Sequence, residues 1–163
     1  MLTSISELLN LTNKIAVVTG GAMGIGKGIS GRLHEAGASV VIADVDDGAA
    51  KAAAEELNTK RPSSALAVHV DVSSADDVNK MVGAAVSGFG KLDILVNNAG
   101  IYPAKPLHDM ADEDFKKVLD VNLHGAYLCT KYASEQMIKQ GAGGKIINIT
   151  SIDALHPSMV GLA

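Results

Sequence analysis

Short runs of apolar residues alternate along this chain with longer stretches in which apolar positions recur every three or four residues. The first run is too uniformly apolar for a strand with one face in water, and it predicts a parallel strand that is covered on both faces. The runs together predict five strands, over residues 14–19, 39–43, 65–70, 93–96 and 145–150.

The stretches between the apolar runs have helical periodicity. In the first of them, one apolar stripe joins Ile25, Ile29 and Leu33, and Gly37 is well placed to end the helix. The predicted helices cover residues 25–36, 48–58, 74–89 and 112–140.

The order of these elements indicates the fold class. Residues 1–13 predict a short amphipathic lead-in, in which Ser4 and Glu7 have the spacing of a capping box. Strand and helix then alternate from residue 14 to residue 163 without a repeat or a linker. The chain therefore predicts one α/β domain over residues 14–163, built on a doubly wound parallel sheet with right-handed crossovers.

A turn with almost no side chains separates the first strand from the first helix, and residues 19–26 read TGGAMGIG. Such a turn lets a bulky anion approach the main chain, while the following helix directs unpaired N–H groups and its positive dipole end toward it. The spacing Gly-x3-Gly-x-Gly differs from the Gly-x-Gly-x2-Gly of the common dinucleotide fingerprint. The turn predicts a site for a dinucleotide pyrophosphate, and the alternative is a tight strand-to-helix connection that binds no ligand.

Two acidic residues follow predicted strands. Asp44 ends the second strand, where a carboxylate can accept hydrogen bonds from the adenosine ribose hydroxyls. Because it would repel a 2′-phosphate, Asp44 favours NAD over NADP; alternatively, it caps a turn with Asp46. Asp71 ends the third strand, where it either accepts from the adenine amino group, with Val72 beside the ring, or simply precedes the next helix.

Composition excludes several function classes. A net charge of −4 and the scarcity of aromatic residues argue against nucleic-acid binding. No apolar run has the length that spans a bilayer, and the histidines show no metal-ligand spacing, so neither a membrane nor a metal is expected. The single cysteine, Cys129, cannot form an internal disulfide and fits a reducing, cytoplasmic compartment.

Several motifs occur together in this chain in a set order. They are Thr19–Gly26, Asp71-Val72, Asn97–Gly100, Asn122 and the run Ile146–Ser151. This set resembles the short-chain dehydrogenase/reductase family from about Lys14 to the last residue. The resemblance implies a Rossmann-like fold that is incomplete at its C-terminal end, with about five of the usual seven strands.

The same resemblance implies an NAD(P)-dependent oxidoreductase. Met23 stands where many NADP-preferring members carry an arginine, which agrees with the interpretation of Asp44 as favouring NAD. The residues implied in cofactor binding are Gly20, Met23, Gly24, Ile25, Gly26, Asp44, Asp71, Val72, Asn98, Ala99 and Gly100.

The resemblance also assigns the acid–base chemistry. Ser151 matches the serine that holds the substrate oxygen, and Asn122 matches the asparagine of a water-linked proton relay. The family's Tyr-x3-Lys would begin just past Ala163, so we expect the 163-residue piece alone to be inactive. An internal Tyr-x3-Lys, Tyr127 to Lys131, precedes Ser151 and is better explained by core packing and a solvated lysine.

Three functions remain open at this point. The first is an oxidoreductase that interconverts a secondary alcohol and a ketone, with a small alcohol or carbonyl substrate and, in its full-length form, a homo-oligomeric state, tetramer or dimer. The second is a non-catalytic dinucleotide-binding module or an inactive fragment. The third, nucleotide-sugar epimerase chemistry, shares the fold but requires a different glycine spacing.

Overall fold

A five-stranded parallel sheet forms the centre of the molecule, in the order β3-β2-β1-β4-β5. The computed structural model describes residues 4–103 and 105–152. The strands are β1 (Ile15–Thr19), β2 (Ser39–Asp44), β3 (Ala65–His69), β4 (Ile94–Asn97) and β5 (Lys145–Asn148). Because β1 lies between β2 and β4, the strand order reverses beside it, and the predicted doubly wound α/β fold is confirmed.

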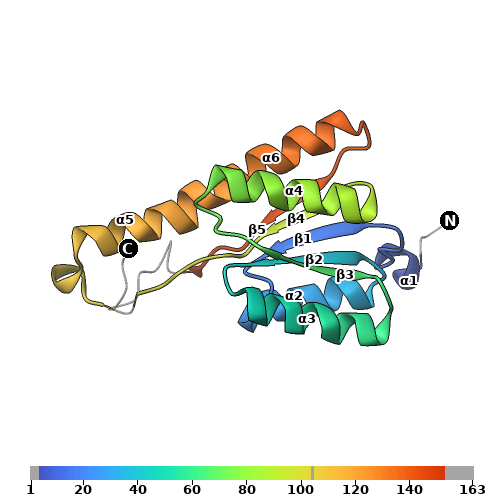
Figure 1. Cartoon of the computed structure of the whole chain (residues 1–163), viewed down its shortest axis with the longest axis horizontal. Coiled ribbons are helices and arrows are strands. Elements are labelled where there is room, and N and C mark those ends of the chain that lie inside the picture. Colours follow the sequence, from blue (N-terminus) through green and yellow to red (C-terminus); the bar gives the residue numbers. More distant parts are fainter. Residues whose placement is uncertain (1–3, 104, 153–163) are drawn as a thin grey trace.

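Two layers of helices cover the sheet, as Figure 1 shows. One layer contains α2 (Gly24–Glu35) and α3 (Asp47–Lys60), and the other contains α4 (Ala75–Phe89) and α6 (Ala126–Lys139). The side chains of β1 alternate between the layers: Val17 packs with residues of α4 and α6, and Val18 packs with residues of α3. This alternation explains why the strand has no polar position, since both of its faces are buried.

A short helix, α1 (Ile5–Leu8), precedes the sheet and confirms the predicted cap. Ser4 accepts a hydrogen bond from the Glu7 amide, and the Glu7 carboxylate accepts one from the Ser4 amide. The side chains of Ile5 and Leu8 are largely exposed, so the cap and not burial shapes this segment.

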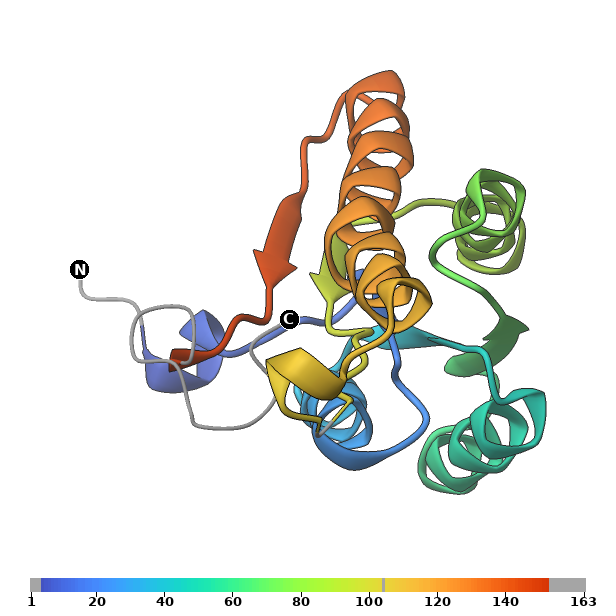
Figure 2. The same cartoon turned by 90° about the vertical axis from the view of Figure 1, so that its left-hand side faces the viewer.

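The predicted helix over residues 112–140 has the expected extent but is not uniform. It consists of α5 (Asp112–Val118), a π-helical turn (Leu119–Gly125) and α6. A π-turn adds a residue to a helical turn and is common at functional sites. This turn contains Asn122, and the 3₁₀ turn η1 (Leu107–Asp109) precedes α5. Figure 2 views this whole helical stretch from its α5 end.

The predicted apolar stripe of α2 is wrong at its first position. Ile25 is 71% exposed, and the residues that α2 buries are Gly26, Ser30 and His34. The small side chains of Gly26 and Ser30 let the helix lie close to its neighbours, and His34 is buried through its contact with Ser64. The last strand is also shorter than predicted, because β5 ends at Asn148.

The buried histidine of α2 should make the stability of the fold sensitive to pH. The Nε2 atom of His34 lies 2.7 Å from the hydroxyl oxygen of Ser64. Only 5% of His34 is exposed. Burial, together with the charges of Arg61 and Lys60, lowers the pKa of His34. As the pH falls, the unfolded chain therefore takes up a proton on this ring before the folded chain does.

We expect unfolding free energy to be at its plateau above pH ~6.5, the ordinary histidine pKa, and to fall by up to about 1.4 kcal/mol per pH unit below it. The decline should stop at the lowered pKa of folded His34. Urea titrations across this range should show a shallower decline for His34→Gln. Equal slopes in the variant and the parent would contradict the prediction.

Candidate functional site

The carboxyl ends of the five strands meet at one edge of the sheet, because all strand pairs are parallel. Ligands of such sheets bind at this edge, next to the point where strand order reverses. The last residues of the strands here are Thr19, Asp44, His69, Asn97 and Asn148. The predicted site residues within the described ranges lie on these strand ends or on the segments that follow them, except Asn122, which lies in the π-helical turn.

The glycine turn adopts a backbone that requires glycine at two positions. Gly20 and Gly24 have φ angles of 61° and 52°, in the left-handed region that side chains disfavour. At Gly26, a Cβ atom would lie 2.0 Å from the carbonyl oxygen of Gly20 and 2.5 Å from the Asn98 amide nitrogen. The first turn of α2 therefore packs directly onto the strand-to-helix connection, with no space for a side chain between them.

Met23 and Ile25 differ from these glycines. Met23 is the N-cap of α2 and has no side-chain capping hydrogen bond. Both side chains are apolar and mostly exposed. These two residues can therefore contact an anion only through their main-chain N–H groups.

Asn98 fastens the glycine turn to the neighbouring strand β4. Its side-chain amide donates to the carbonyl oxygens of Thr19, at 3.0 Å, and Gly20, at 3.1 Å. In return, the Thr19 hydroxyl accepts hydrogen bonds from the main-chain N–H groups of Asn98 and Ala99, both at 3.0 Å. We call this set of four hydrogen bonds the Thr19–Asn98 clamp.

The sequence predicts only one side of the Thr19–Asn98 clamp. Asn98 and Ala99 were predicted to line a cofactor, whereas no role was assigned to the Thr19 side chain. Its signal in the sequence is a polar residue at the end of an apolar strand, and Thr19 is 1% exposed. A hydroxyl so deeply buried requires hydrogen-bond partners.

Asp44 lies on the other side of the turn. One carboxylate oxygen accepts from the Ala22 amide at 3.1 Å, and the other accepts from the Asp46 amide, also at 3.1 Å. The bond to Asp46 is the turn-capping alternative considered for this residue. Only 8% of Asp44 is exposed, so the carboxylate is a fixed negative charge at the edge of the glycine turn.

The residues after β3 divide into an exposed acid and a buried valine. One carboxylate oxygen of Asp71 accepts hydrogen bonds from the Ser73 amide, at 2.9 Å, and the Ser73 hydroxyl, at 2.7 Å. Val72 is buried, and it packs against Gly125, where a Cβ atom would come within 2.7 Å of the valine Cγ2. The turn after β3 thus contacts the π-helical turn through a glycine.

Asn122 joins the π-helical turn to the segment after β4. Its side-chain oxygen accepts from the Ile101 amide at 2.8 Å, and its side-chain nitrogen donates to the Ile101 carbonyl at 2.9 Å. A Cβ atom at Gly100 would lie 3.4 Å from the same asparagine oxygen. The structure therefore brings together Gly100 and Asn122, which lie 22 positions apart in the chain.

Asn97 forms a second polar connection, which the sequence interpretation did not identify. Its side-chain nitrogen donates to the hydroxyl of Thr130 at 3.0 Å and to the side-chain oxygen of Asn148 at 2.8 Å, so it joins α6 to β5. Among the described residues, its own side-chain oxygen has no hydrogen-bond partner although it is buried. Two adjacent asparagines at a strand end are the signal that could have drawn attention to it.

A hollow of about 190 Å³ lies between the strand ends and the π-helical turn. Cys129 is on its wall, and burial raises the pKa of this thiol to about 12, so it stays protonated and unreactive. The lining comprises Thr19, Val72, Asn97, Ala99, Asn122, Gly125, Ala126, Cys129, Asn148, Ile149 and Thr150. Ser151 follows directly after this lining, three residues beyond β5, and is exposed.

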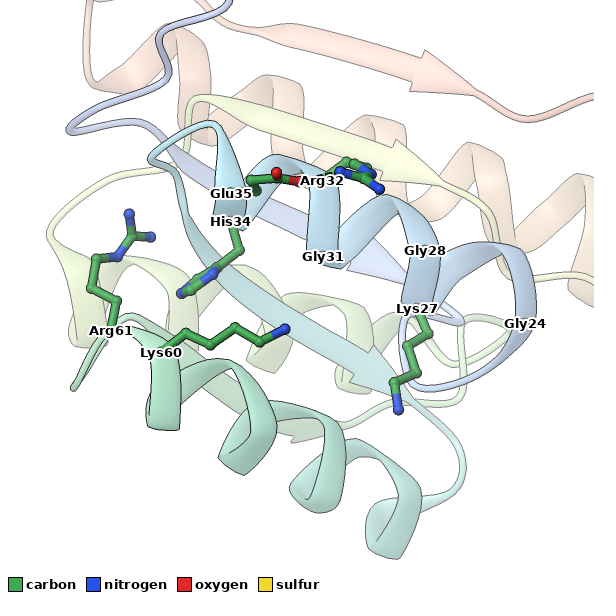
Figure 3. Close-up of a pocket in the computed structure, with 9 residues that line it drawn as sticks. All are labelled: Gly24, Lys27, Gly28, Gly31, Arg32, His34, Glu35, Lys60 and Arg61. Carbon is green, nitrogen blue, oxygen red and sulfur yellow. Dashed lines mark hydrogen bonds and ion pairs between the residues drawn. The ribbon is translucent and has the colours of Figure 1, made fainter.

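A larger hollow, of about 800 Å³, lies between α2 and α3 (Figure 3). Three cationic side chains that line it already have partners in the protein. Lys27 Nζ lies 2.8 Å from Glu56 Oε2, Arg32 pairs with Glu35, and Arg61 donates to the Ala38 carbonyl. Three of the strand-end residues, Thr19, Asn97 and Asn148, line the smaller hollow, so that hollow is part of the candidate site. Gly24, at the end of the glycine turn, lines the larger one.

Two further classes of site are absent from residues 4–103 and 105–152. In these ranges, no group of three or more histidine, cysteine or acidic residues is placed to hold a metal ion. The helices described there are also too short or too polar to cross a membrane.

Comparison with known proteins agrees with this geometry. The "short chain dehydrogenase/reductase astE" of Aspergillus oryzae is 38% identical over 157 residues, covering 96% of this chain and 60% of that protein. The "galactitol 2-dehydrogenase" of Agrobacterium fabrum is 38% identical over 143 residues, covering 88% of this chain and 54% of that protein. The chain thus spans somewhat more than half of the length of these curated relatives.

A solved structure shares the fold. It is a 7α-hydroxysteroid dehydrogenase complexed with NADH and 7-oxo glycochenodeoxycholic acid, with a TM-score of 0.89 and 34% identity over 99% of this chain and 61% of that one. The family model described as short chain dehydrogenase matches residues 14–163. Its match starts just before β1 and includes the glycine turn, the Thr19–Asn98 clamp and Asn122. The chain therefore belongs to the short-chain dehydrogenase family.

Proposed function

We propose that this chain is the cofactor-binding portion of an NAD-dependent oxidoreductase that interconverts a secondary alcohol and a ketone. The observation that carries the proposal is the glycine turn, fixed on one side by the Thr19–Asn98 clamp and on the other by Asp44. A rigid turn with exposed main-chain N–H groups at the start of α2 suits a pyrophosphate. The carboxylate beside it suits the hydroxyls of an adenosine ribose.

The preference for NAD rests on charge. A 2′-phosphate beside the Asp44 carboxylate would be repelled, and neither arginine of the chain lies near enough to offset this. Arg61 contacts the carbonyl of Ala38, at the opposite end of β2 from Asp44. Arg32 belongs to the last turn of α2, far along the helix from the glycine turn.

The remaining site residues are assigned to the rest of the cofactor and to the substrate. Asp71 and Val72 would hold the adenine, and Asn98, Ala99 and Gly100 would line the riboses. The nicotinamide supplies hydride transfer when it is bound. Ser151 would hold the substrate oxygen, and Asn122 would take part in the proton relay, for which the amide contacts to Ile101 fix its position.

The substrate class follows from the relatives. Galactitol is a polyol, and the steroid relative is a hydroxysteroid dehydrogenase, so both names describe chemistry at an alcohol carbon. We therefore propose a secondary alcohol or the matching ketone as the substrate. A polyol and a hydroxysteroid are the first compounds to test.

Titration calorimetry with NADH and NADPH tests the proposal. We expect the 163-residue chain to bind NADH at least about tenfold more tightly than NADPH, a difference of about 1.4 kcal/mol or more. It should not turn over polyols or hydroxysteroids by itself, whereas a version extended beyond Ala163 should. Failure to bind NADH would contradict the proposal, and binding without turnover in the extended version would favour a non-catalytic dinucleotide-binding module.

We also propose that the whole protein forms a dimer or tetramer. Four large apolar side chains recur every fourth residue along α5, the π-helical turn and α6, and each is 40% or more exposed. An exposed apolar stripe of this kind is typical of a contact surface. Its members are Phe115, Leu119, Leu123 and Tyr127. The prediction that Tyr127 packs in the core is therefore wrong, since its side chain faces outward with this stripe.

A reducing, cytoplasmic compartment is part of the same proposal. It is supported by the sequence, which has a single cysteine, and by the burial of Cys129. A lone, protonated thiol in the core fits a compartment in which disulfides are rare.

A further inference from the structure

Asp44 joins three elements of the fold. It is the last residue of β2, it accepts from Ala22 in the glycine turn, and it accepts from Asp46, the N-cap of α3. Both bonds are 3.1 Å long, and each uses a different carboxylate oxygen. The carboxylate is therefore engaged with the protein's own main chain at the place where the proposed ribose would bind.

The bond to Ala22 is needed by the turn itself. Ala22 is 4% exposed, so without Asp44 its N–H group would be buried without an acceptor. The adjacent Gly21 N–H donates to the Ala43 carbonyl at 3.3 Å, which brings a second group of the turn onto the end of β2. The glycine turn thus rests on β2 through two hydrogen bonds and on β4 through the Thr19–Asn98 clamp.

These two roles of the carboxylate are compatible. Each carboxylate oxygen has two lone pairs, so it can hold a main-chain N–H and still accept from a ligand hydroxyl. We propose that Asp44 is a positioning residue for the pyrophosphate turn in addition to being the acceptor for the ribose. This inference rests on the proposed function, and it adds that Asp44 supports binding of cofactor groups that it does not touch.

Cofactor preference depends on both roles of Asp44. A substitution that removes the acid in order to admit NADPH also removes the acceptor for Ala22. It relieves the repulsion of a 2′-phosphate but loosens the turn that binds the pyrophosphate of either dinucleotide. We therefore expect Asp44→Ala to bind NADH more weakly than the parent does. Its affinity for NADPH should also stay below the affinity of the parent for NADH.

A cofactor analogue separates the two roles. The analogue is NADH whose adenosine ribose lacks both hydroxyls, so it cannot bond to the carboxylate of Asp44. By calorimetry, we expect Asp44→Ala to weaken binding of this analogue at least about tenfold. Asp44→Asn should give an intermediate loss, because its amide oxygen can serve one of the two N–H donors. Equal affinity of the parent and Asp44→Ala for the analogue would overturn the inference.

A matched variant tests whether the effect is specific. Asp46→Ala removes the cap of α3, in which the Asp46 carboxylate accepts from the Ala49 amide at 2.9 Å, but keeps the main-chain N–H that bonds to Asp44. It should leave affinity for the analogue unchanged. An equal loss in Asp46→Ala and Asp44→Ala would show general destabilisation and overturn the inference.

Hydrogen exchange provides a readout that needs no cofactor. In the ligand-free protein, the amide of Ala22 should exchange at least about tenfold faster in Asp44→Ala than in the parent, while the amides of β4 keep their rates. Unchanged exchange at Ala22 would overturn the inference even if NADH binds. Failure of the parent to bind NADH, with exchange at Ala22 as expected, would instead count against the proposed function.

Discussion

Replacing Gly26 with alanine should weaken dinucleotide binding strongly and destabilise the fold. The added Cβ would lie 2.0 Å from the Gly20 carbonyl oxygen and 2.5 Å from the side-chain nitrogen of Asn98. The first neighbour is main chain, and the second is held by two hydrogen bonds in the Thr19–Asn98 clamp, so neither can rotate away. The start of α2 must therefore move off the turn.

We expect Gly26→Ala to lower the free energy of unfolding by about 3 kcal/mol, as overpacking of a rigid site does. Affinity for NADH should fall at least about 100-fold, or about 2.7 kcal/mol, because the main-chain N–H groups no longer converge on one anion. Urea denaturation and calorimetry measure the two effects separately.

Gly28→Ala is the matched control in the same helix. A Cβ atom at Gly28 meets nothing within 4 Å, and alanine has the higher helix propensity. This variant should raise stability by about 0.5–1 kcal/mol and leave NADH affinity unchanged. If Gly26→Ala bound NADH as well as Gly28→Ala does, the close packing of α2 on the turn would have no role in binding.

The sequence was informative where a pattern repeats over many residues. Uninterrupted apolar runs predicted the strands to within one or two residues at most ends, since a strand buried on both faces has no polar position, as in β1. The pattern was misleading at Ile25, because α2 packs through Gly26 and Ser30. Apolar periodicity does not detect a helix that approaches its neighbours through small residues.

The candidate site was predicted only in part for a related reason. Glycine spacing predicted the turn, and the acid after β2 was identified, but the Thr19–Asn98 clamp joins residues 79 positions apart in the chain. This contact exists because β1 and β4 are neighbours in the sheet although β2 and β3 lie between them in sequence. A pairing that depends on strand order has no periodic signal along the chain.

Hydrogen bonds fix the side chains of both asparagines at the end of β4, so the site is rigid. Asn98 bonds to the turn, and Asn97 bonds to Asn148 and Thr130, so the two amides fix opposite neighbours of β4. A pyrophosphate site needs its N–H donors held in place before the ligand arrives, because ordering them on binding would reduce affinity. The hydroxyl of Thr19 contributes by accepting from the main-chain N–H groups of Asn98 and Ala99, which fixes the end of β4 that holds the turn.

Replacing Thr19 with valine, which has nearly the same shape, should remove this hydroxyl and little else. The N–H groups of Asn98 and Ala99, which are half-buried, would lose their acceptor, at a cost of about 1–3 kcal/mol each. We therefore expect a loss of about 3 kcal/mol in the free energy of unfolding, despite the good fit of valine to a buried strand. Affinity for NADH should also fall about tenfold, since the turn keeps only its bonds to the Asn98 side chain and to β2.

Thr59→Val provides the comparison that makes this result interpretable. The Thr59 hydroxyl donates to the Glu56 carbonyl on the exposed side of α3, where water can replace it, so the change should stay within about 0.5 kcal/mol. Urea denaturation of both variants measures the difference. If Thr19→Val were as stable as Thr59→Val, the buried amides would have found other acceptors. The glycine turn would then be held by the Asn98 side chain and Asp44 alone.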